Sequence, residues 1–232
     1  MRNLVVREKI DSLITREIWS AQLWPELEER FYVIVFGGAI RDILFGYEQN
    51  IRDIDVVLYP IQNCDNSIQE DLLRTIIESN CKDCYRRNQF DGYKIQNKSM
   101  TMDIWLLKDT WAFKQKILSA SPQNLLKSVY LNIDAYAWNY NTGRFISHCD
   151  RIKREKIDIV LEESACEYLN LIRAVVFEKK YNMCLADRII MKLREILKRW
   201  PKVEKDVFAI EEKHYGNIVV TKQDIRNAIE RS

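Results

Sequence analysis

Two aspartates one residue apart, Asp53 and Asp55, follow fifteen residues behind a pair of glycines that ends an apolar run. Two carboxylates spaced i, i+2 on a strand point to the same face of a sheet, about 6–7 Å apart along it. Their mutual repulsion is costly unless a cation lies between them. Carboxylate oxygens favour Mg²⁺ among the divalent ions, so the doublet predicts a metal site on a strand.

The glycines, Gly37 and Gly38, directly follow the apolar residues 33–36. Glycine lets backbone N–H groups approach an anion closely, as binding of a triphosphate requires. An Asp-x-Asp pair alone is more often part of an ordinary loop, and a glycine pair alone is weaker still. The combination is more specific: the chain contains, in this order, the glycines, an Arg41–Asp42 pair, the aspartate doublet and a later acid in a strand. This order favours nucleotide chemistry.

Asp103 is that later acid, within the otherwise apolar residues 101–105. A lone carboxylate inside such a strand is expensive to bury without a partner. If this strand lies next to the one that carries Asp53 and Asp55, three carboxylates converge. Such a cluster is what two Mg²⁺ ions need for in-line displacement at phosphorus. The pattern predicts Asp53, Asp55 and Asp103 as catalytic residues and metal ligands.

Periodicity predicts the elements that position these residues. A strand over 31–36 leads through the glycines into a helix over 39–45 that Gly46 ends, and a second strand follows over 54–59. Near the N-terminus we expect one amphipathic helix over 4–23, broken near Pro25. The remaining expected elements are a helix over 67–79, a hairpin over 85–88 and 93–96, a strand over 101–107, a helix over 111–118, and helices over 163–179, 185–200, 203–211 and 221–231.

This order predicts an α/β (α+β) fold with a small, mixed, mainly antiparallel sheet flanked by helices, followed by an all-helical part. A basic run near residues 151–156 marks the expected boundary, which gives domains over 1–155 and 156–232.

Composition narrows the class of protein. The 232 residues are 47% hydrophobic and 30% charged, as in ordinary globular proteins, and the net charge of +2 gives no overall field for nucleic acid. Charges interrupt the N-terminus where a signal peptide needs an apolar run, and no stretch approaches the roughly 18 apolar residues of a membrane span. Six cysteines are too few for a disulfide scaffold, and Cys81 and Cys84 are expected to be free thiols. These features predict a cytoplasmic protein without a membrane partner.

Residues 37–46, followed by Asp53-Ile54-Asp55, resemble the head-domain signature of the bacterial poly(A) polymerase and CCA-adding tRNA nucleotidyltransferase family. That family belongs to the polymerase-β-like nucleotidyltransferase superfamily. Residues 133–138 and 171–177 are similar to its Thr-Ile-Asn-Ala-Leu-Ala-type segment and to its first neck helix. The resemblance covers roughly residues 31–200 and implies a nucleotidyltransferase head over 1–155 and a helical, neck-like domain over 156–232.

The resemblance also implies roles for individual residues. Asp53 and Asp55 would bind both metal ions, with Asp103 as the third carboxylate. Gly37 and Gly38 would hold the β- and γ-phosphates of an NTP. Arg41 would also lie near these phosphates as a nucleotide-binding residue, and Asp42 would orient Arg41 or cap the helix.

The family's neck motif, Glu-Asp-x-x-Arg, reads the incoming base and aligns with residues 166–170. Glu167 keeps an acid at its position, whereas Asn170 stands in place of the base-reading arginine. The family's Arg-Arg-Asp segment should fall near residues 128–130, which read Ser-Val-Tyr. The resemblance therefore implies nucleotide contacts at Glu167 and Asn170 that differ in kind from those of the family.

The expected activity is Mg²⁺-dependent transfer of a nucleoside monophosphate from an NTP, such as ATP, to a hydroxyl acceptor, with release of pyrophosphate. The resemblance implies that the acceptor is the 3′ end of a tRNA-like RNA. The helical part is too short for the family's domains that hold the tRNA elbow, so we do not expect CCA addition itself. Two alternatives stand beside it: modification of a protein or small molecule, and a non-catalytic nucleotide- or RNA-binding module. Retention of three repelling carboxylates argues against the last.

Overall fold

The computed structural model describes residues 2–15, 18–62, 65–81, 84–88, 90–96, 100–146 and 156–232. The chain divides into two compact units, which we treat separately. The first unit comprises Met1–Ser128 and Asp134–Ile152, and the second comprises Val129–Ile133 and Lys153–Ser232. The boundary and most of the basic run expected near residue 155 fall within residues 147–155, outside the described residues.

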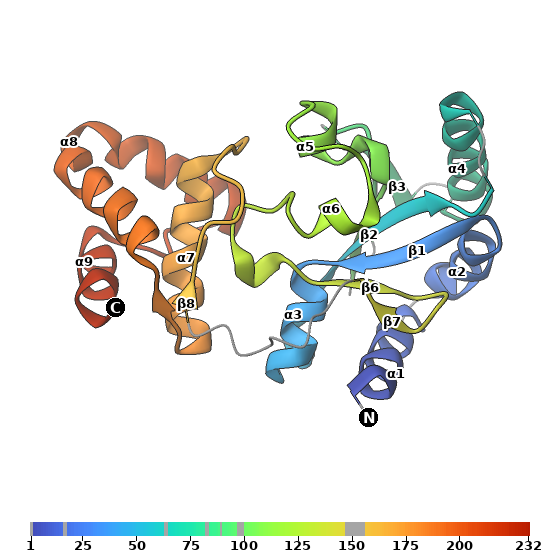
Figure 1. Ribbon diagram of the computed structural model, residues 1–232, viewed down its shortest axis with the longest axis horizontal. Coiled ribbons are helices and arrows are strands. Elements are labelled where there is room, and N and C mark those ends of the chain that lie inside the picture. Colours follow the sequence, from blue (N-terminus) through green and yellow to red (C-terminus); the bar gives the residue numbers. More distant parts are fainter. Residues whose placement is uncertain are drawn as a thin grey trace. The chain divides into compact units, whose positions relative to one another are not determined.

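A mixed sheet forms the centre of the first unit (Figure 1), and its described strands run in the order β3-β4-β5-β2-β1-β6-β7. In these pairs only β2 and β5 are parallel, so the mixed, mainly antiparallel sheet expected from the sequence is confirmed. The strands are β1 (Phe31–Phe36), β2 (Asp53–Pro60), β3 (Tyr85–Arg87), β4 (Tyr93–Gln96), β5 (Thr101–Leu106), β6 (Ala137–Asn139) and β7 (Arg144–Phe145).

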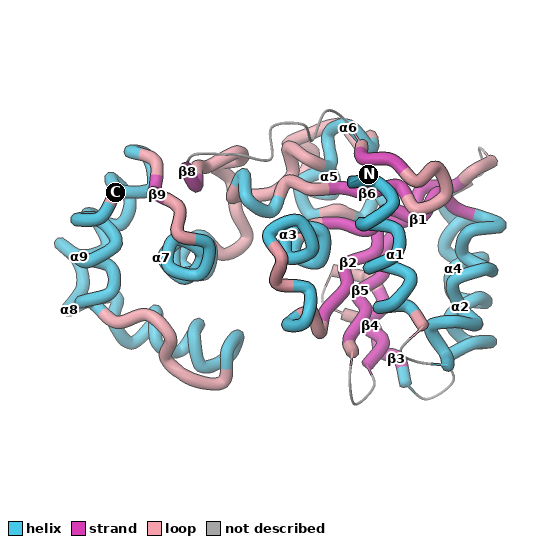
Figure 2. The backbone as a smooth tube through the Cα atoms, turned by 90° about the horizontal axis from the view of Figure 1, so that it is seen from below, coloured by secondary structure: helices cyan, strands magenta, loops and turns pink. Residues whose placement is uncertain are grey.

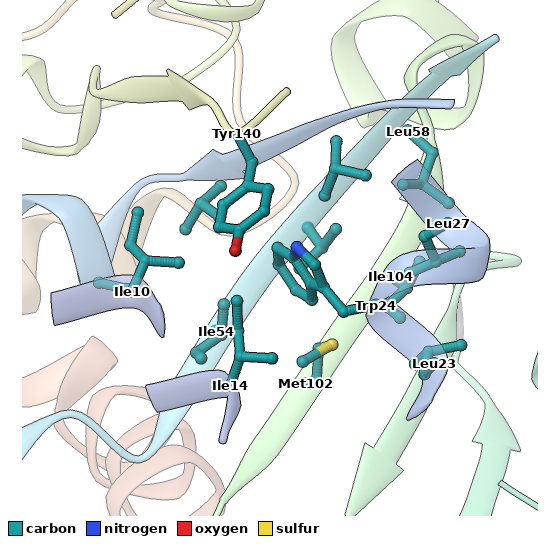
Figure 3. Close-up of a cluster of buried hydrophobic side chains, with 14 of the residues drawn as sticks. Ile10, Ile14, Leu23, Trp24, Leu27, Ile54, Leu58, Met102, Ile104 and Tyr140 are labelled. Atoms are coloured by element: carbon teal, nitrogen blue, oxygen red, sulfur yellow. The ribbon is translucent and has the colours of Figure 1, made fainter. Parts of the chain in front are cut away.

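One face of this sheet is buried beneath α1 (Arg2–Ile14), α2 (Ile18–Arg30) and α4 (Asn66–Cys81). Figure 2 shows α2 and α4 next to each other beside the strands. Figure 3 shows the core that results, in which side chains from α1 and α2 meet alternate residues of β2 and β5, among them Ile10, Leu23, Trp24, Leu27, Ile54, Leu58, Met102 and Ile104. Because side chains alternate along a strand, the residues between these core positions point to the opposite face, and the three aspartates are among them.

Short elements complete the first unit: α3 (Gly38–Phe45), η1 (Glu48–Asn50), η3 (Leu107–Asp109), α5 (Trp111–Lys114), α6 (Pro122–Leu125) and η4 (Asn132–Asp134), the last of which reaches into the second unit. α3 ends at Gly46 in the left-handed conformation, as expected from the sequence. The helix expected over 111–118 is too long, because α5 stops at Lys114 and Lys116 adopts a positive φ of 58°.

Pro25 does not break a helix, contrary to the sequence-based expectation. The interruption comes earlier, because α1 ends at Ile14 and α2 begins at Ile18 with Pro25 in its interior. Leu23, Trp24 and Leu27 are each at most 2% exposed. The packing of these three side chains maintains the helix across the proline. Pro25 itself is exposed, so water can hydrogen-bond to the carbonyl that has lost its helical partner.

The second unit is mainly helical, with α7 (Glu167–Tyr181), α8 (Asp187–Tyr215), α9 (Lys222–Arg231) and a short parallel pair, β8 (Lys156–Ile157) with β9 (Cys184–Leu185). The expected stop at Trp200 is wrong, because α8 runs on through Pro201 while Trp200, Val203 and Val207 stay buried. The expected cap at Thr221 is confirmed as a full capping box with Asp224. Within the described residues, no helix has the length and apolarity needed to cross a membrane.

Candidate active site

The register of the sheet places the three predicted acids on one face of two neighbouring strands. β2 and β5 are parallel, with Asp55 directly opposite Asp103 and Asp53 opposite Thr101. Directly paired residues on neighbouring strands point to the same side, with their backbones about 4.8 Å apart. Asp53 is exposed, and Asp55 and Asp103 are half-buried. The condition attached to Asp103, that its strand neighbour the strand of the doublet, is therefore met.

The glycine turn lies beside the same carboxylates. β1 pairs with β2 so that Phe36 is opposite Asp55, and Gly37 follows at the end of β1. Gly37 has φ +68°, a conformation that other residues rarely adopt, and its N–H donates to the Tyr136 carbonyl at 2.8 Å. A Cβ built on Gly37 would lie 3.7 Å from Oδ2 of Asp55. The N-terminus of α3, which favours anions, thus begins next to a candidate metal ligand.

Arg41 is buried and bound to acids of its own unit. It is 6% exposed, its Nε donates to Oδ1 of Asp42 at 3.0 Å, and its Nη1 donates to the carboxylate of Asp134. Asp42 and Asp134 are 7% and 8% exposed. The guanidinium also lies against Gly38, because a Cβ on that glycine would be 3.4 Å from Nη2. This ion-pair cluster ties α3 to the segment that carries Asp134.

Asp103 is already paired with a cation. Nζ of Lys94 lies 2.8 Å from its Oδ2, and Nδ2 of Asn88 lies 3.4 Å from its Oδ1. Lys94 is directly opposite Asp103 in the β4–β5 register, so both side chains lie on the same face. Both carboxylate oxygens of Asp103 are therefore engaged by the hairpin formed by β3 and β4.

The oxygens of the three aspartates are suitable ligands for a divalent ion, although their side chains are not arranged around a common metal position in this structure. Among the described residues, no three His, Cys, Asp or Glu side chains are gathered closely enough to hold a metal ion. Lys94 in addition occupies an oxygen of Asp103 that a metal ion would need. Asp53 and Asp55, on one face beside an anion-favouring helix start, supply the oxygen ligands that Mg²⁺ prefers.

Glu167 and Asn170 lie in the second unit, at the start of α7. Oε1 of Glu167 accepts hydrogen bonds from Nζ of Lys192 at 2.6 Å and from the Tyr130 hydroxyl at 3.3 Å. Burial, together with the neighbouring Glu167, raises the pKa of Tyr130 far above its usual value. Nδ2 of Asn170 donates to Oγ of Ser164 at 2.7 Å. Base recognition by Glu167 and Asn170 stays a prediction.

The two cysteines with close spacing are free thiols, as expected. Sγ of Cys84 donates to the Cys81 carbonyl at 2.8 Å at the end of α4. Burial raises the pKa of Cys81 to about 12, so this thiol stays protonated near neutral pH and is a poor nucleophile or metal ligand.

Sequence reasoning missed three residues that shape the site: Lys94, Asn88 and Asp134. One signal was available for Lys94, because it alternates with apolar Tyr93 and Ile95 and must face away from the core. That it meets Asp103 depends on the strand register, which one sequence does not give.

The sheet order, the glycine turn and the carboxylate-bearing face belong to a fold that this chain shares with solved tRNA nucleotidyltransferases. Among solved structures, an apo CCA-adding enzyme matches with a TM-score of 0.61 and 18% identity, over 90% of this chain and 50% of that chain. The Thermotoga maritima CCA-adding enzyme complexed with tRNA-CCA matches with a TM-score of 0.58 and 18% identity, over 90% and 48%. A tRNA nucleotidyltransferase complexed with a primer tRNA and an incoming ATP analogue matches with a TM-score of 0.53 and 19% identity, over 73% and 49%.

At these identities the likeness establishes the fold, and the chain spans about half the length of the structures it matches. No protein-family model matches the sequence. A search of curated protein sequences found no significant match either.

Proposed function

We propose that this protein is a nucleotidyltransferase that moves a nucleoside monophosphate from an NTP to a hydroxyl group. The observation that carries the proposal is the placement of Asp53, Asp55 and Asp103 on one face of two adjacent strands, beside the Gly37 turn. This arrangement occurs in a fold shared with solved CCA-adding enzymes. NTPs and RNA ends occur together in the cytoplasm, where we place the reaction.

In the reaction, the acceptor hydroxyl loses its proton to water and its oxygen attacks the α-phosphorus. The bond between the α-phosphorus and the oxygen that bridges to the β-phosphorus breaks, and pyrophosphate leaves with the electron pair. Two Mg²⁺ ions, when bound, lower the pKa of the attacking hydroxyl and neutralise the leaving pyrophosphate. Asp53 and Asp55 would hold these ions, and Asp103 would complete the ligand set. The start of α3 at Gly38 binds the β- and γ-phosphates through its backbone N–H groups. Gly37, whose own N–H is bonded to the Tyr136 carbonyl, contributes its positive φ and its lack of a side chain, which let the phosphates approach the turn.

Arg41 has a supporting part in this scheme. Its guanidinium is held by Asp42 and Asp134 beside Gly38, so it fixes the shape of the phosphate-binding turn. In the second unit, Glu167 and Asn170 are the proposed contacts to the base. Asparagine in place of arginine leaves one fewer charged donor there, which favours a relaxed choice of base.

The proposed acceptor is an RNA 3′ end. Two of the solved structures that share this fold contain tRNA, and others contain ATP or CTP. The alternative, transfer to a protein or a small molecule, follows from the departures at residues 128–130 and at Asn170.

The test uses NTPs labelled on the α-phosphate, with Mg²⁺, a mixed RNA pool and a protein extract. We expect label in RNA, and a loss of at least about a thousandfold in Asp55→Asn, because the reaction loses a metal ligand. Asp65→Asn, at an exposed aspartate that precedes α4, is the matched control and should retain activity. Label in protein alone would show that the acceptor is a protein and not RNA. Label that still enters RNA in the Asp53→Ala, Asp55→Ala double variant would refute the catalytic assignment.

A further inference from the structure

Lys94, a residue that the proposed chemistry does not use, lies in line with the candidate metal ligands. Across three neighbouring strands, Lys94 is opposite Asp103 and Asp103 is opposite Asp55. The lysine Nζ is 2.8 Å from Oδ2 of Asp103, and the two side chains are 30% and 21% exposed. A charge-assisted hydrogen bond of this length compensates one of the three carboxylates of the face.

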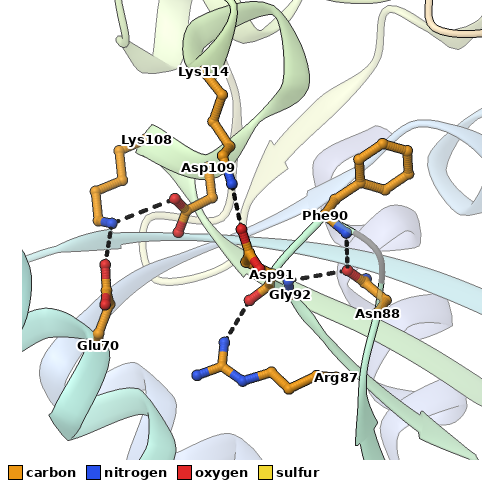
Figure 4. A network of polar contacts seen from close by, with 9 residues as sticks. All are labelled: Glu70, Arg87, Asn88, Phe90, Asp91, Gly92, Lys108, Asp109 and Lys114. Carbon is orange, nitrogen blue, oxygen red and sulfur yellow. Dashed lines mark hydrogen bonds and ion pairs between the residues drawn. The ribbon is translucent and has the colours of Figure 1, made fainter.

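Asn88 adds a second, fixed donor to Asp103. Its Oδ1 accepts hydrogen bonds from the backbone N–H groups of Phe90, at 2.9 Å, and Gly92, at 3.0 Å. These bonds leave only the amide nitrogen free to face the carboxylate, and Nδ2 lies 3.4 Å from Oδ1 of Asp103. Figure 4 shows the hydrogen bonds from Phe90 and Gly92 to Asn88.

The loop between β3 and β4 is itself anchored, so the position of Lys94 is set in advance. The carboxylate of Asp91 accepts from Lys114 at 2.5 Å, and its carbonyl accepts from Arg87 at 2.5 Å (Figure 4). Gly92 passes so close to β5 that an added Cβ would lie 2.9 Å from the Ile104 carbonyl oxygen. Lys94 is only two residues after Gly92, so the anchored loop fixes the part of β4 from which the Lys94 side chain reaches Asp103.

We propose that Lys94 is a built-in exchangeable cation: it neutralises Asp103 while no metal is bound there, and it must leave before a second divalent ion can bind. This inference rests on the proposed function, which supplies the divalent ions. An ammonium group and a metal ion on one carboxylate repel each other, so the two compete. A lysine is suited to the exchange because its charge is compact and its stem is flexible. The charge of a bound triphosphate then favours the second ion, which makes its binding dependent on substrate.

The test is direct binding of Mn²⁺ without nucleotide, measured by electron paramagnetic resonance of the free ion. We expect Lys94→Met and Lys94→Gln to bind a second Mn²⁺ at least about tenfold more tightly than the wild type, the size of effect that a neighbouring charge has on a carboxylate. Lys94→Arg should behave as the wild type. Lys94→Met combined with Asp103→Asn should lose the gain, because the exchanged carboxylate is then missing.

Lys9→Met is the matched control, because Lys9 forms a similar pair with Glu48, at 2.7 Å, between α1 and η1. It should leave Mn²⁺ binding unchanged. If both Lys94 variants bind Mn²⁺ as the wild type does, while Asp55→Asn binds less, the exchange is refuted and the proposed function stands. If neither the wild type nor the Lys94 variants bind Mn²⁺, with or without NTP, the exchange and the metal-dependent function both fail.

Discussion

Arg41 shows how single residues shape this site through charge. The resemblance places it near the phosphates, and in the structure its guanidinium is buried against Asp42 and Asp134. Removing one of the two acids is costly, because the buried guanidinium then loses a charge-assisted hydrogen bond that water cannot replace. The cluster therefore fixes the glycine turn from two sides. Arg41 and Asp42 follow Gly38 closely in the chain, and the carbonyl of Asp134 lies against Gly37.

Removal of Asp134 is therefore expected to weaken the whole first unit. Asp134→Ala should lower the free energy of unfolding by about 1.5–3 kcal/mol, as for loss of a buried hydrogen bond to a charged group, because Asp42 still pairs with Arg41. Urea denaturation followed by circular dichroism measures this. The exposed pair of Arg74 with Asp71 supplies the control, because Asp71→Ala should change stability by less than about 1 kcal/mol. Equal losses in the two variants would show that the buried cluster contributes nothing special.

At the scale of elements, local patterns predicted the strands better than they predicted the helix ends. Strand 31–36 and the hairpin strand 93–96 were expected with the bounds they have, because β-branched and alternating residues mark them. The prolines at 25 and 201 misled the prediction of the helices, since packing of apolar side chains on either side outweighs the lost hydrogen bond.

The candidate site divides in the same way. The Asp53 and Asp55 doublet and the glycine turn are local in sequence, so the sequence could propose them together as candidates. The pairing of Asp103 with Asp55 and with Lys94 joins three strands across the sheet, and such a register is set by tertiary packing that one sequence does not reveal.

The connection between α8 and α9 depends on a buried acid, which makes stability in this element sensitive to pH. Glu211 is fully buried, and its Oε1 accepts from the Val220 N–H at 2.8 Å. Its Oε2 has no hydrogen-bond partner among the described residues. Burial raises the pKa of Glu211 above its usual value of 4.5. The folded protein therefore keeps this proton at a pH where the unfolded chain has lost it.

The stabilising contribution of Glu211 is complete below about pH 4.5 and falls as pH rises toward the folded pKa. Glu211→Gln cannot ionise, so we expect it to be more stable than the wild type at pH 7–8 and to lose this advantage near pH 4. Thermal unfolding across this pH range measures the difference. Glu212→Gln, at the exposed neighbouring position, should follow the wild-type pH profile. A constant difference between Glu211→Gln and wild type at every pH would contradict the assignment.

At the scale of the whole molecule, charge and length limit how the chain can hold an RNA. The net charge is only +2, and the chain spans about half the length of the solved tRNA-bound enzyme that shares its fold. Nucleic-acid binding by phosphate contacts grows with the number of cations that face the strand. If the acceptor is RNA, as proposed, we expect these 232 residues to contact few of its phosphates.

If so, a short single-stranded RNA should be extended with a kcat/KM within about tenfold of that for a whole tRNA. A rise from 50 to 200 mM salt should lower the affinity for RNA by less than about a hundredfold, since six to ten phosphate contacts would cost about 10³–10⁵. Primer extension and fluorescence anisotropy measure these two quantities. A strong preference for intact tRNA with a steep salt dependence would show an extended RNA-binding surface instead.

We propose above all that Asp53, Asp55 and Asp103 hold the metal ions of a bound nucleotide. The most direct measurement is a crystal structure of the protein with Mn²⁺ and a non-hydrolysable NTP, in which anomalous scattering locates each ion. We expect manganese bonded to the carboxylates of Asp53 and Asp55, a second ion at Asp103 with Lys94 displaced, and the triphosphate at the Gly37 turn. Manganese and nucleotide bound together at other residues, with these three aspartates uncoordinated, would contradict the account.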